Sequence, residues 1–248
     1  MSLSVISIPE KKPTICTIVG DGGLGKTSLA ADFPGPVVFI RTEDGVQSIA
    51  GRKDIAMFPI ARNSEMVLKQ IEELITEEHN FKTLVIDTVT QLHVLIEAKI
   101  IKEDGKAKSI NTAMGGYGAG HSACANEHRM IREDCGYLSE KKGMNIVFLA
   151  HCDTDTVDLP DQEPFSRYTM RINKKSISQY TDNVDLVGFI KLKTYTTGDE
   201  NKKKAISDGS RIITCYPTPS HISKNRYGIE EDLLFEKGKN PLLQFIGE

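Results

Sequence analysis

The sequence predicts an α/β fold, in which a mainly parallel β-sheet is flanked by helices and extended by an antiparallel hairpin near the C-terminus. Short apolar runs alternate with segments of helical periodicity through the first 150 residues, a pattern typical of strand–helix–strand units. A complete glycine-rich loop motif joins the first predicted strand to the first predicted helix. Two alternating segments in the C-terminal third predict the hairpin.

The first predicted strand and helix flank the glycine-rich loop. Residues 14–19 are rich in β-branched side chains and predict a short buried strand, and residues 27–33 can form the helix that follows. Residues 34–36, with the sequence Pro-Gly-Pro, cannot continue that helix. The apolar run 37–40 therefore predicts the second strand.

Further elements alternate along the rest of the chain. The apolar run 55–60 predicts a third strand, and residues 64–78 show apolar side chains at helical spacing, with Ser64 as the expected N-cap. The remaining expected elements are strands at 81–87 and 145–150, helices at 89–101 and 123–142, and hairpin strands at 185–196 and 205–216 around a polar turn at 198–204.

The composition is that of an ordinary globular protein. The 248 residues are 39% hydrophobic and 26% charged, and the net charge of −3 provides no overall positive field for nucleic acid. The cysteines are odd in number and form no C-x-x-C pair, which argues against a disulfide framework or a zinc site and favours a reducing compartment. No signal peptide or membrane-spanning segment is recognised, so we expect a cytoplasmic protein without a membrane partner.

The glycine-rich loop carries the complete phosphate-binding motif G-x-x-x-x-G-K-[ST]. Its glycines allow backbone N–H groups to approach phosphate oxygens, where a side chain would clash. Lys26 is expected to reach the β and γ phosphates of a nucleoside triphosphate, and the Thr27 hydroxyl is expected to hold Mg²⁺. The strand-to-helix context disfavours the alternative, a glycine-rich surface turn. The predicted nucleotide-binding residues are Gly20, Asp21, Gly22, Gly23, Leu24, Gly25, Lys26, Thr27 and Ser28.

Polar residues follow three of the predicted strands, at the ends where ligands gather in open α/β sheets. Glu43 and Asp44 follow the second strand, where a solvated acidic turn is equally compatible with the sequence. Asp87 ends a buried strand, and we assign it to Mg²⁺ because that metal needs an oxygen ligand from an adjacent strand; a helix-capping role is compatible with this assignment. His151 follows a later strand and could contact a γ-phosphate, although a lone histidine is usually a satisfied polar group.

Two polar segments are expected to be loops. The stretch 102–122 is rich in charged residues and glycine, which predicts a mobile loop. The stretch 154–180 interleaves basic and aromatic residues, a composition that suits single-stranded nucleic acid through phosphate contacts and base stacking. An ordinary solvated loop fits this composition at least equally well.

The phosphate loop, Asp87 and the order of the elements resemble the RecA-like ATPases, and most of all the phage RecA-like proteins that bind and anneal single-stranded DNA. The resemblance covers residues 14–228, so we expect a single RecA-like domain over residues 1–248. It implies ATP and Mg²⁺ as ligands, and it implies that Glu43 is the general base that polarises the attacking water. His151 falls where RecA has glutamine, so a contact with the γ-phosphate is expected there.

A short basic motif near the C-terminus extends the resemblance. The sequence from Lys224 through Arg226 to Gly228 is similar to the Lys-Asn-Arg-Phe-Gly motif of the bacterial RadA branch, with tyrosine in place of phenylalanine. By this resemblance, Lys224 and Arg226 would reach the nucleotide of a neighbouring subunit and stabilise charge on the transferred phosphoryl group. A basic turn is the alternative. The resemblance implies a homo-oligomer, either a ring or a filament.

The expected function is ATP-dependent binding and annealing of single-stranded DNA in phage-type recombination, in the cytoplasm of a bacterial host. Residues 115–121 and 165–175 would face the DNA, and a single-strand binding protein would be a further partner. Two alternatives remain. One is a RecA-type replication motor or helicase loader, and the other is a nucleotide-switched scaffold that hydrolyses little ATP.

Overall fold

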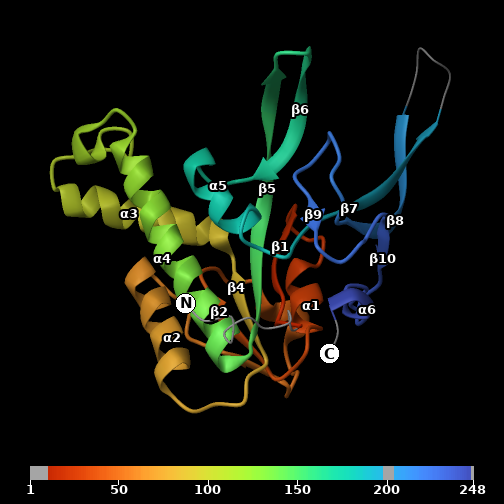
Figure 1. Ribbon diagram of the computed structural model, residues 1–248, viewed down its shortest axis with the longest axis horizontal. Coiled ribbons are helices and arrows are strands. Elements are labelled where there is room, and N and C mark those ends of the chain that lie inside the picture. Colours follow the sequence, from red (N-terminus) through yellow and green to blue (C-terminus); the bar gives the residue numbers. More distant parts are fainter. Residues whose placement is uncertain (1–10, 198–203, 247–248) are drawn as a thin grey trace, which may run out of the picture.

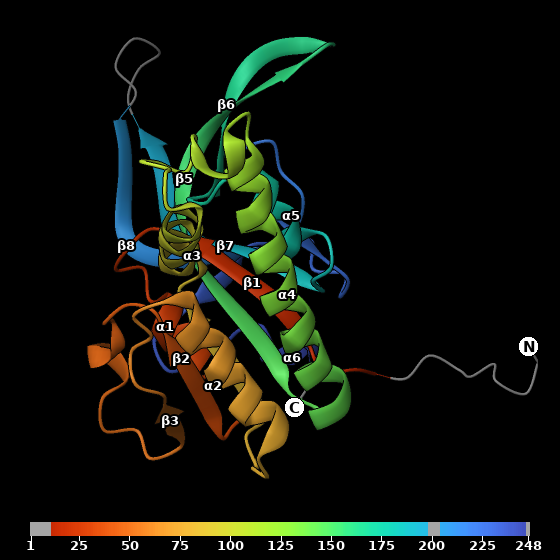
Figure 2. The ribbon, with the colours of Figure 1, turned by 90° about the vertical axis from the view of Figure 1, so that its left-hand side faces the viewer.

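Among the residues that the structure describes, a ten-stranded sheet forms the centre of the molecule, with helices on both of its faces (Figures 1 and 2). The computed structural model describes residues 11–197 and 204–246. The strand order is β10-β8-β7-β1-β5-β4-β2-β3, with β6 paired to β5 and β9 paired to β7. The strands are β1 (Ile15–Gly20), β2 (Val37–Arg41), β3 (Ile55–Met57), β4 (Thr83–Asp87), β5 (Asn145–Leu159), β6 (Gln162–Met170), β7 (Leu186–Thr197), β8 (Lys204–Thr214), β9 (Lys224–Asn225) and β10 (Leu233–Phe235).

The helices divide between the two faces of the sheet. Buried side chains of α2, α3, α4 and α5 belong to one hydrophobic core, and those of α1 and α6 belong to a second core. The helices are α1 (Lys26–Ala31), α2 (Ser64–Thr76), α3 (Val89–Asp104), α4 (Ala119–Lys142), α5 (Lys174–Thr181) and α6 (Leu243–Ile246), with short 3₁₀ turns η2 (Val46–Ile49) and η3 (Ala113–Gly115). In the part of the chain that the structure describes, none of these helices has the length and apolar character needed to cross a bilayer.

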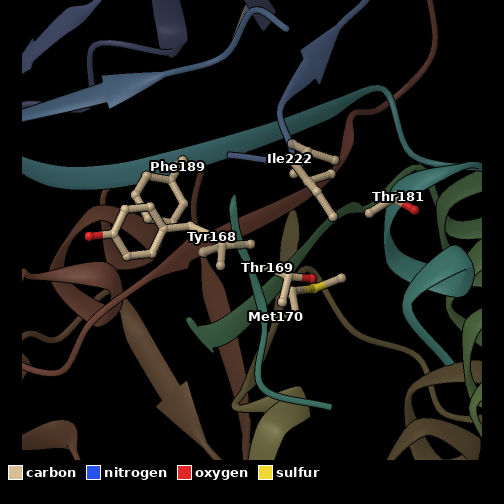
Figure 3. A pocket seen from close by; sticks show the side chains of 8 residues that line it. Tyr168, Thr169, Met170, Thr181, Phe189 and Ile222 are labelled. Atoms are coloured by element: carbon tan, nitrogen blue, oxygen red, sulfur yellow. The ribbon is translucent and has the colours of Figure 1, made fainter. Parts of the chain in front are cut away.

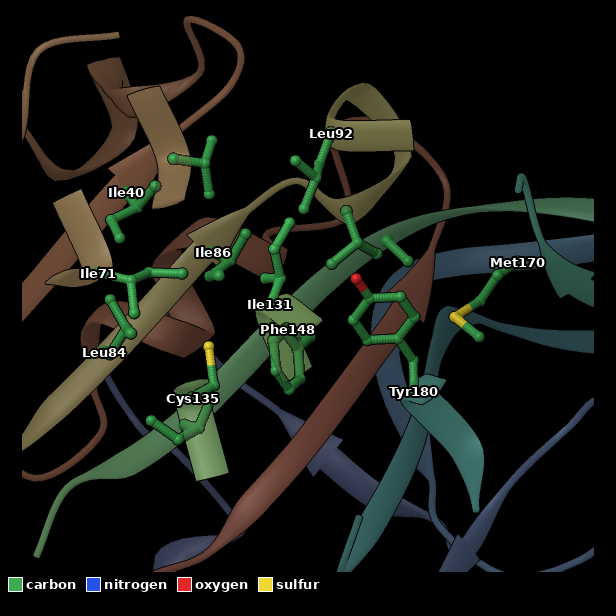
Figure 4. Packing of buried hydrophobic residues seen from close by; sticks show 14 of the residues in the cluster. Ile40, Ile71, Leu84, Ile86, Leu92, Ile131, Cys135, Phe148, Met170 and Tyr180 are labelled. Atoms are coloured by element: carbon green, nitrogen blue, oxygen red, sulfur yellow. The ribbon is translucent and has the colours of Figure 1, made fainter. Parts of the chain in front are cut away.

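Side chains of the central strands alternate between the two cores. Ile86 in β4 and Phe148 in β5 face the core that contains α2, α3 and α4 (Figure 4). Their neighbours Val85 and Val147 face the core that contains α1. Because these strands are buried on both faces, they occur in the sequence as continuous apolar runs, which is why they could be predicted.

The central strands are parallel and end together at one edge of the sheet. Strands β7, β1, β5, β4, β2 and β3 run in the same direction. Gly20 is in register with His151, and Arg41 is in register with Asp87. We call this end the carboxyl edge and the opposite end, where β1 begins beside Asn145, the amino edge.

The segment 154–180, which was expected to be a loop, is folded. Strand β5 continues past residue 150 and pairs with β6 in an antiparallel ribbon, and α5 follows. The prediction of a loop was wrong because much of the ribbon is exposed. Backbone hydrogen bonds hold its two strands together, and few of its side chains are buried. The sequence therefore lacks the apolar periodicity that indicates a buried strand. Both views show this ribbon projecting beyond the body of the molecule (Figures 1 and 2).

Three smaller expectations also change. The stretch 102–122 is partly folded, because it contains η3 and the start of α4, which begins before residue 123. Asn63, rather than Ser64, caps α2 through its bond from the Met66 amide. Thr88, rather than Asp87, caps α3. Residues 198–203 of the expected polar turn lie outside the described part of the chain.

Candidate active site

The glycine-rich loop leaves β1 at Gly20 and enters α1 at Lys26. A Cβ atom on Gly20 would lie 2.6 Å from the carbonyl oxygen of Ile190 in β7. Gly25 has a φ of 91°, in the left-handed region that favours glycine, and a Cβ there would lie 2.6 Å from Nη1 of Arg211. Packing therefore requires glycine at position 20, and the backbone conformation favours glycine at position 25.

Lys26 is buried, and its ammonium group is held inside the loop. Its Nζ donates hydrogen bonds to the carbonyl oxygens of Gly20 and Asp21, both at 2.9 Å. The same atom lies 3.4 Å from Nδ1 of His151. Burial lowers the pKa of Lys26, and nearby carboxylates oppose this shift. The loop thus holds a cation at the position where the motif predicts a phosphate-binding lysine.

Thr27 and Asp87 meet at the carboxyl edge. Oγ1 of Thr27 donates a hydrogen bond to Oδ2 of Asp87 at 2.9 Å. Burial raises the pKa of Asp87, whereas the bond from Thr27 lowers it. Mg²⁺ is usually bound through one or two protein carboxylates together with substrate phosphates, so this pair of hard oxygen donors fits it. Within the described residues, no group of three or more His, Cys, Asp or Glu side chains is arranged as a metal site.

Glu43 is half-buried and lies beside His151. Its Oε1 atom is 3.1 Å from Nε2 of His151, and this hydrogen bond is the main reason that the pKa of Glu43 is lowered. Because Lys26 donates toward Nδ1, a neutral histidine with its proton on Nε2 satisfies both contacts. The neighbouring Asp44 is exposed and pairs with Arg41 at 3.8 Å. Glu43, rather than Asp44, is therefore the carboxylate that belongs to the site.

One open cleft of about 400 Å³ brings most of the predicted loop residues together with three predicted residues from other strand ends. Its lining includes Gly22, Gly23, Gly25, Lys26, Thr27, Ser28, Glu43, Asp87 and His151. Asp21 lies beside this group, where its Oδ1 accepts a hydrogen bond from Sγ of Cys152 at 3.1 Å. The segments that contribute these residues are far apart in the sequence and meet because the parallel strands end at one edge.

The cleft also contains residues that the sequence did not indicate, namely Gly45, Ser48, Arg211 and Lys237. Nη1 of Arg211 donates to the carbonyl oxygen of Leu24 at 3.1 Å, and its guanidinium lies 4.6 Å from the ring centroid of Phe235. Arg211 belongs to β8 and Phe235 to β10. The C-terminal strands therefore bring a second cation to the loop, although no motif or spacing marks it in the sequence.

Lys224 and Arg226 lie at the amino edge, away from the cleft of the same chain. Strand β9 pairs with the beginning of β7, where Asn225 faces Leu186, whereas the glycine-rich loop follows the end of β1. Nζ of Lys224 donates to the carbonyl oxygen of Asp182 at 2.6 Å, and Arg226 pairs with Asp185 at 2.9 Å. Within one chain neither side chain reaches the cleft, so the predicted role requires a neighbouring subunit.

The two segments expected to face DNA differ in what they expose. In 115–121, Tyr117 is fully exposed and has a positive φ of 51°. Nζ of Lys175, at the start of α5, donates to the carbonyl oxygen of Gly118 at 3.0 Å. In 165–175, Tyr168 is 43% exposed. Tyr180, one of the aromatic residues of the longer stretch 154–180, is fully buried, with its hydroxyl 2.7 Å from Nδ1 of His128. Tyr180 therefore cannot stack on a base.

Comparison with known proteins identifies the family of this chain. A family model described as an AAA domain matches residues 12–227, a range that contains the whole cleft except Lys237. A search among curated proteins found no match. The match agrees with the mostly parallel sheet and with the phosphate-loop geometry, and it supports nucleotide hydrolysis in general. The chain therefore belongs to the AAA domain family, whose members have a P-loop ATPase-type domain.

Proposed function

We propose that this protein hydrolyses ATP in a Mg²⁺-dependent reaction at the carboxyl edge of its sheet. The observation that carries this proposal is the convergence of Lys26, the Thr27–Asp87 pair and Glu43 on one cleft. Each group has a distinct role in phosphoryl transfer, and the cleft has room for a triphosphate at the glycine-rich loop.

The roles follow from charge and position. Lys26 offsets negative charge on the β and γ phosphates, exchanging its bonds to loop carbonyls for bonds to phosphate oxygens. Mg²⁺, held by Thr27 and Asp87, would neutralise further charge on the phosphate oxygens. Both groups act on charge that builds as the terminal phosphoryl group is transferred, which is where electrostatic stabilisation lowers the barrier.

Glu43 serves as the general base. Its lowered pKa keeps the carboxylate ionised near neutral pH, so it can accept a proton from water. The water oxygen forms a bond to the γ-phosphorus as the bond between that phosphorus and the β–γ bridging oxygen breaks. ADP leaves with the electron pair of the broken bond, and the proton is carried by Glu43 until it is released with phosphate.

We further propose that single-stranded DNA is the partner, in RecA-like annealing or recombination of the phage type. Residues in and beside one glycine-rich loop support this partner. Tyr117 provides a fully exposed aromatic ring in a glycine-rich loop, and Lys175 lies beside the same loop. Base stacking on aromatic side chains next to cations is the usual mode of sequence-tolerant single-strand binding.

ATPase activity and annealing of complementary oligonucleotides, measured with and without single-stranded DNA over a salt series, test this function. We expect turnover that EDTA abolishes, together with DNA binding that weakens as salt rises because phosphate contacts release counterions. Tyr117→Ala should weaken DNA binding with ATP binding unchanged, and Tyr137→Ala, an exposed tyrosine on α4, is the control. ATP turnover without DNA binding at low salt would contradict the proposal that DNA is the partner, while the proposal of ATP hydrolysis would stand. DNA unwinding would favour a motor, and ATP binding without turnover would favour a switched scaffold.

Because Lys224 and Arg226 lie at the amino edge, we also propose that the active site is completed in a homo-oligomer. In a head-to-tail arrangement the amino edge of one copy faces the carboxyl edge of the next. Arg226 would then exchange its exposed pair with Asp185 for contact with the neighbour's terminal phosphate.

A further inference from the structure

The ribbon formed by residues 153–170 is strongly acidic, and we call it the acidic ribbon. It carries five carboxylates, from Asp153, Asp155, Asp158, Asp161 and Glu163, against one guanidinium, from Arg167. Asp158, Asp161 and Glu163 at its tip are all exposed. This surface repels the phosphates of a nucleic acid, which basic side chains normally bind.

The root of the acidic ribbon is anchored, whereas its tip stands alone. At the root, Tyr168 packs on Phe189 with ring centroids 5.1 Å apart, beside a small apolar pocket that Met170 also lines (Figure 3). The Tyr168 amide donates to the carbonyl oxygen of Ser220 at 2.8 Å. From residue 156 to residue 167, the described chain shows no hydrogen bond or ion pair to any other element.

An isolated two-stranded ribbon is only marginally stable in water. The tip nevertheless holds its pairing, with Val157 opposite Phe165, and leaves Leu159 41% exposed. Exposed carboxylates from Asp158, Asp161 and Glu163 lie near these apolar residues along the two strands and their turn. Exposed apolar and charged side chains together on a projecting ribbon fit a contact with another protein.

The amino edge carries the opposite charge. Lys11, Lys12, Lys82 and Arg226 line two adjoining hollows of about 430 and 500 Å³, and we call the three lysines the basic edge. Lys11, Lys12 and Lys82 are exposed, and none of them forms an ion pair within the described residues. The nearby carboxylates are already engaged, since Asp185 pairs with Arg226 and Glu140 pairs with Lys141.

We propose that the acidic ribbon docks on the basic edge of a second copy of this chain. The two surfaces lie at opposite ends of the parallel strands, because β5 continues into the ribbon beyond the carboxyl edge and Lys82 precedes β4 at the amino edge. Two complementary surfaces at opposite ends of one molecule produce head-to-tail association. The inference rests on the subunit-interface part of the proposed function, and it assigns the ribbon to the assembly rather than to DNA.

Charge reversal with complementation tests this proposal. The ribbon variant carries Asp158→Lys, Asp161→Lys and Glu163→Lys, and the edge variant carries Lys11→Glu, Lys12→Glu and Lys82→Glu. Self-association is measured by sedimentation velocity with Mg²⁺ and a non-hydrolysable ATP analogue at low and high salt. We expect each variant alone to associate at least tenfold more weakly than the wild type, and an equimolar mixture of the two to recover association. Salt should weaken the wild-type assembly.

A matched control places the same change of charge elsewhere on the surface. Glu65→Lys, Glu72→Lys and Glu73→Lys lie on exposed positions of α2 and should leave association unchanged. Binding of a fluorescent ATP analogue checks that each variant is folded. If the ribbon reversal fails this check, the neutral variant Asp158→Asn, Asp161→Asn and Glu163→Gln replaces it and should weaken association in the same direction.

Three results would overturn the proposal. They are a monomeric wild type at high concentration, a ribbon variant that associates like the wild type, and a mixture that fails to recover association. Loss of DNA binding with unchanged association in the ribbon variant would assign the ribbon to DNA instead. ATP turnover by the wild type is measured in parallel, so failure of this interface is distinguished from failure of the proposed ATPase.

Discussion

Nε2 of His151 lies 3.1 Å from Oε1 of Glu43, while the other nitrogen of the same ring faces Nζ of Lys26 at 3.4 Å. One imidazole thus connects the lysine expected to bind phosphate with the carboxylate expected to activate water. His151 lowers the pKa of Glu43 by its hydrogen bond. We therefore treat His151 as a residue that positions the base, in addition to its expected contact with the γ-phosphate.

Replacing His151 with Ala should change the pH dependence of ATP hydrolysis. Loss of the hydrogen bond raises the pKa of Glu43, and since the ionised carboxylate is the active form, activity is lost at a higher pH as the solution is acidified. The acid limb of the kcat/KM profile should therefore move to higher pH, with kcat reduced by about 10- to 100-fold near neutral pH. His151→Gln, which keeps an amide donor, is the control, and the acid limb of its kcat/KM profile should stay closer to that of the wild type. An unchanged acid limb in His151→Ala would contradict this role.

Gly20→Ala should destabilise the fold itself. The new methyl group would lie 2.6 Å from the carbonyl oxygen of Ile190, so β1 and β7 must separate slightly. We expect the free energy of unfolding to fall by roughly 1 to 3 kcal/mol, measured by urea denaturation. Gly22→Ala is the matched control in the same loop, because no atom lies within 4 Å of a Cβ at that position. Equal stability of the two variants would contradict the packing account of Gly20.

Arg211→Ala should weaken ATP binding. The guanidinium is held at the cleft by Phe235 and by the carbonyl oxygen of Leu24, where it can form charge-assisted bonds with the ligand. Loss of one such bond costs about 1.5 to 3 kcal/mol, so the Kd for ATP should rise by roughly 10- to 100-fold. Lys239→Ala is the control, because it removes a cation that pairs with Glu236 outside the cleft. Titration with ATP should show that this variant binds ATP with wild-type affinity. The same affinity in Arg211→Ala would exclude Arg211 from ligand binding.

Arg226→Ala should reduce kcat by about 10³-fold or more while ATP binding survives, if Arg226 completes the neighbour's site. A mixture of Arg226→Ala and Glu43→Gln tests this directly. A site with a functional Glu43 can then receive Arg226 from the adjacent copy, so the mixture should be more active than either variant alone. Lys141→Ala, another exposed cation that pairs on the surface, is the control. Absence of recovery in assembled mixtures would argue for a basic turn without a catalytic role.

The sequence allowed the central sheet to be predicted because its strands are buried on both faces. Val85 and Ile86 face different cores, so the segment is apolar throughout and bounded by polar residues. The ribbon of β5 and β6 could not be found in this way, because it buries little and pairs largely with itself. Tyr180 also differs from expectation, because it was included in a polar stretch expected to be a loop, whereas it lies in α5 and is fully buried.

The candidate site was predictable where a short motif or a strand end marks it. Lys26 and Thr27 follow from motif spacing, and Asp87 follows from the apolar run that precedes it. The structure adds the contact between His151 and Glu43, which are 108 positions apart, and that pairing depends on strand order rather than on any local signal. Arg211 was missed for the same reason, since only the pairing of β8 with β7 brings it to the loop.

The most direct test of the central claim is the single-turnover rate of ATP hydrolysis by Glu43→Gln compared with the wild type, at saturating Mg²⁺ and protein. The account predicts a fall of about 10²- to 10⁴-fold in the rate with an unchanged Kd for ATP, because the amide cannot accept the proton from water. Asp44→Asn, at the adjacent exposed carboxylate, should hydrolyse ATP like the wild type. A Glu43→Gln variant that hydrolyses ATP at the wild-type rate would contradict the account.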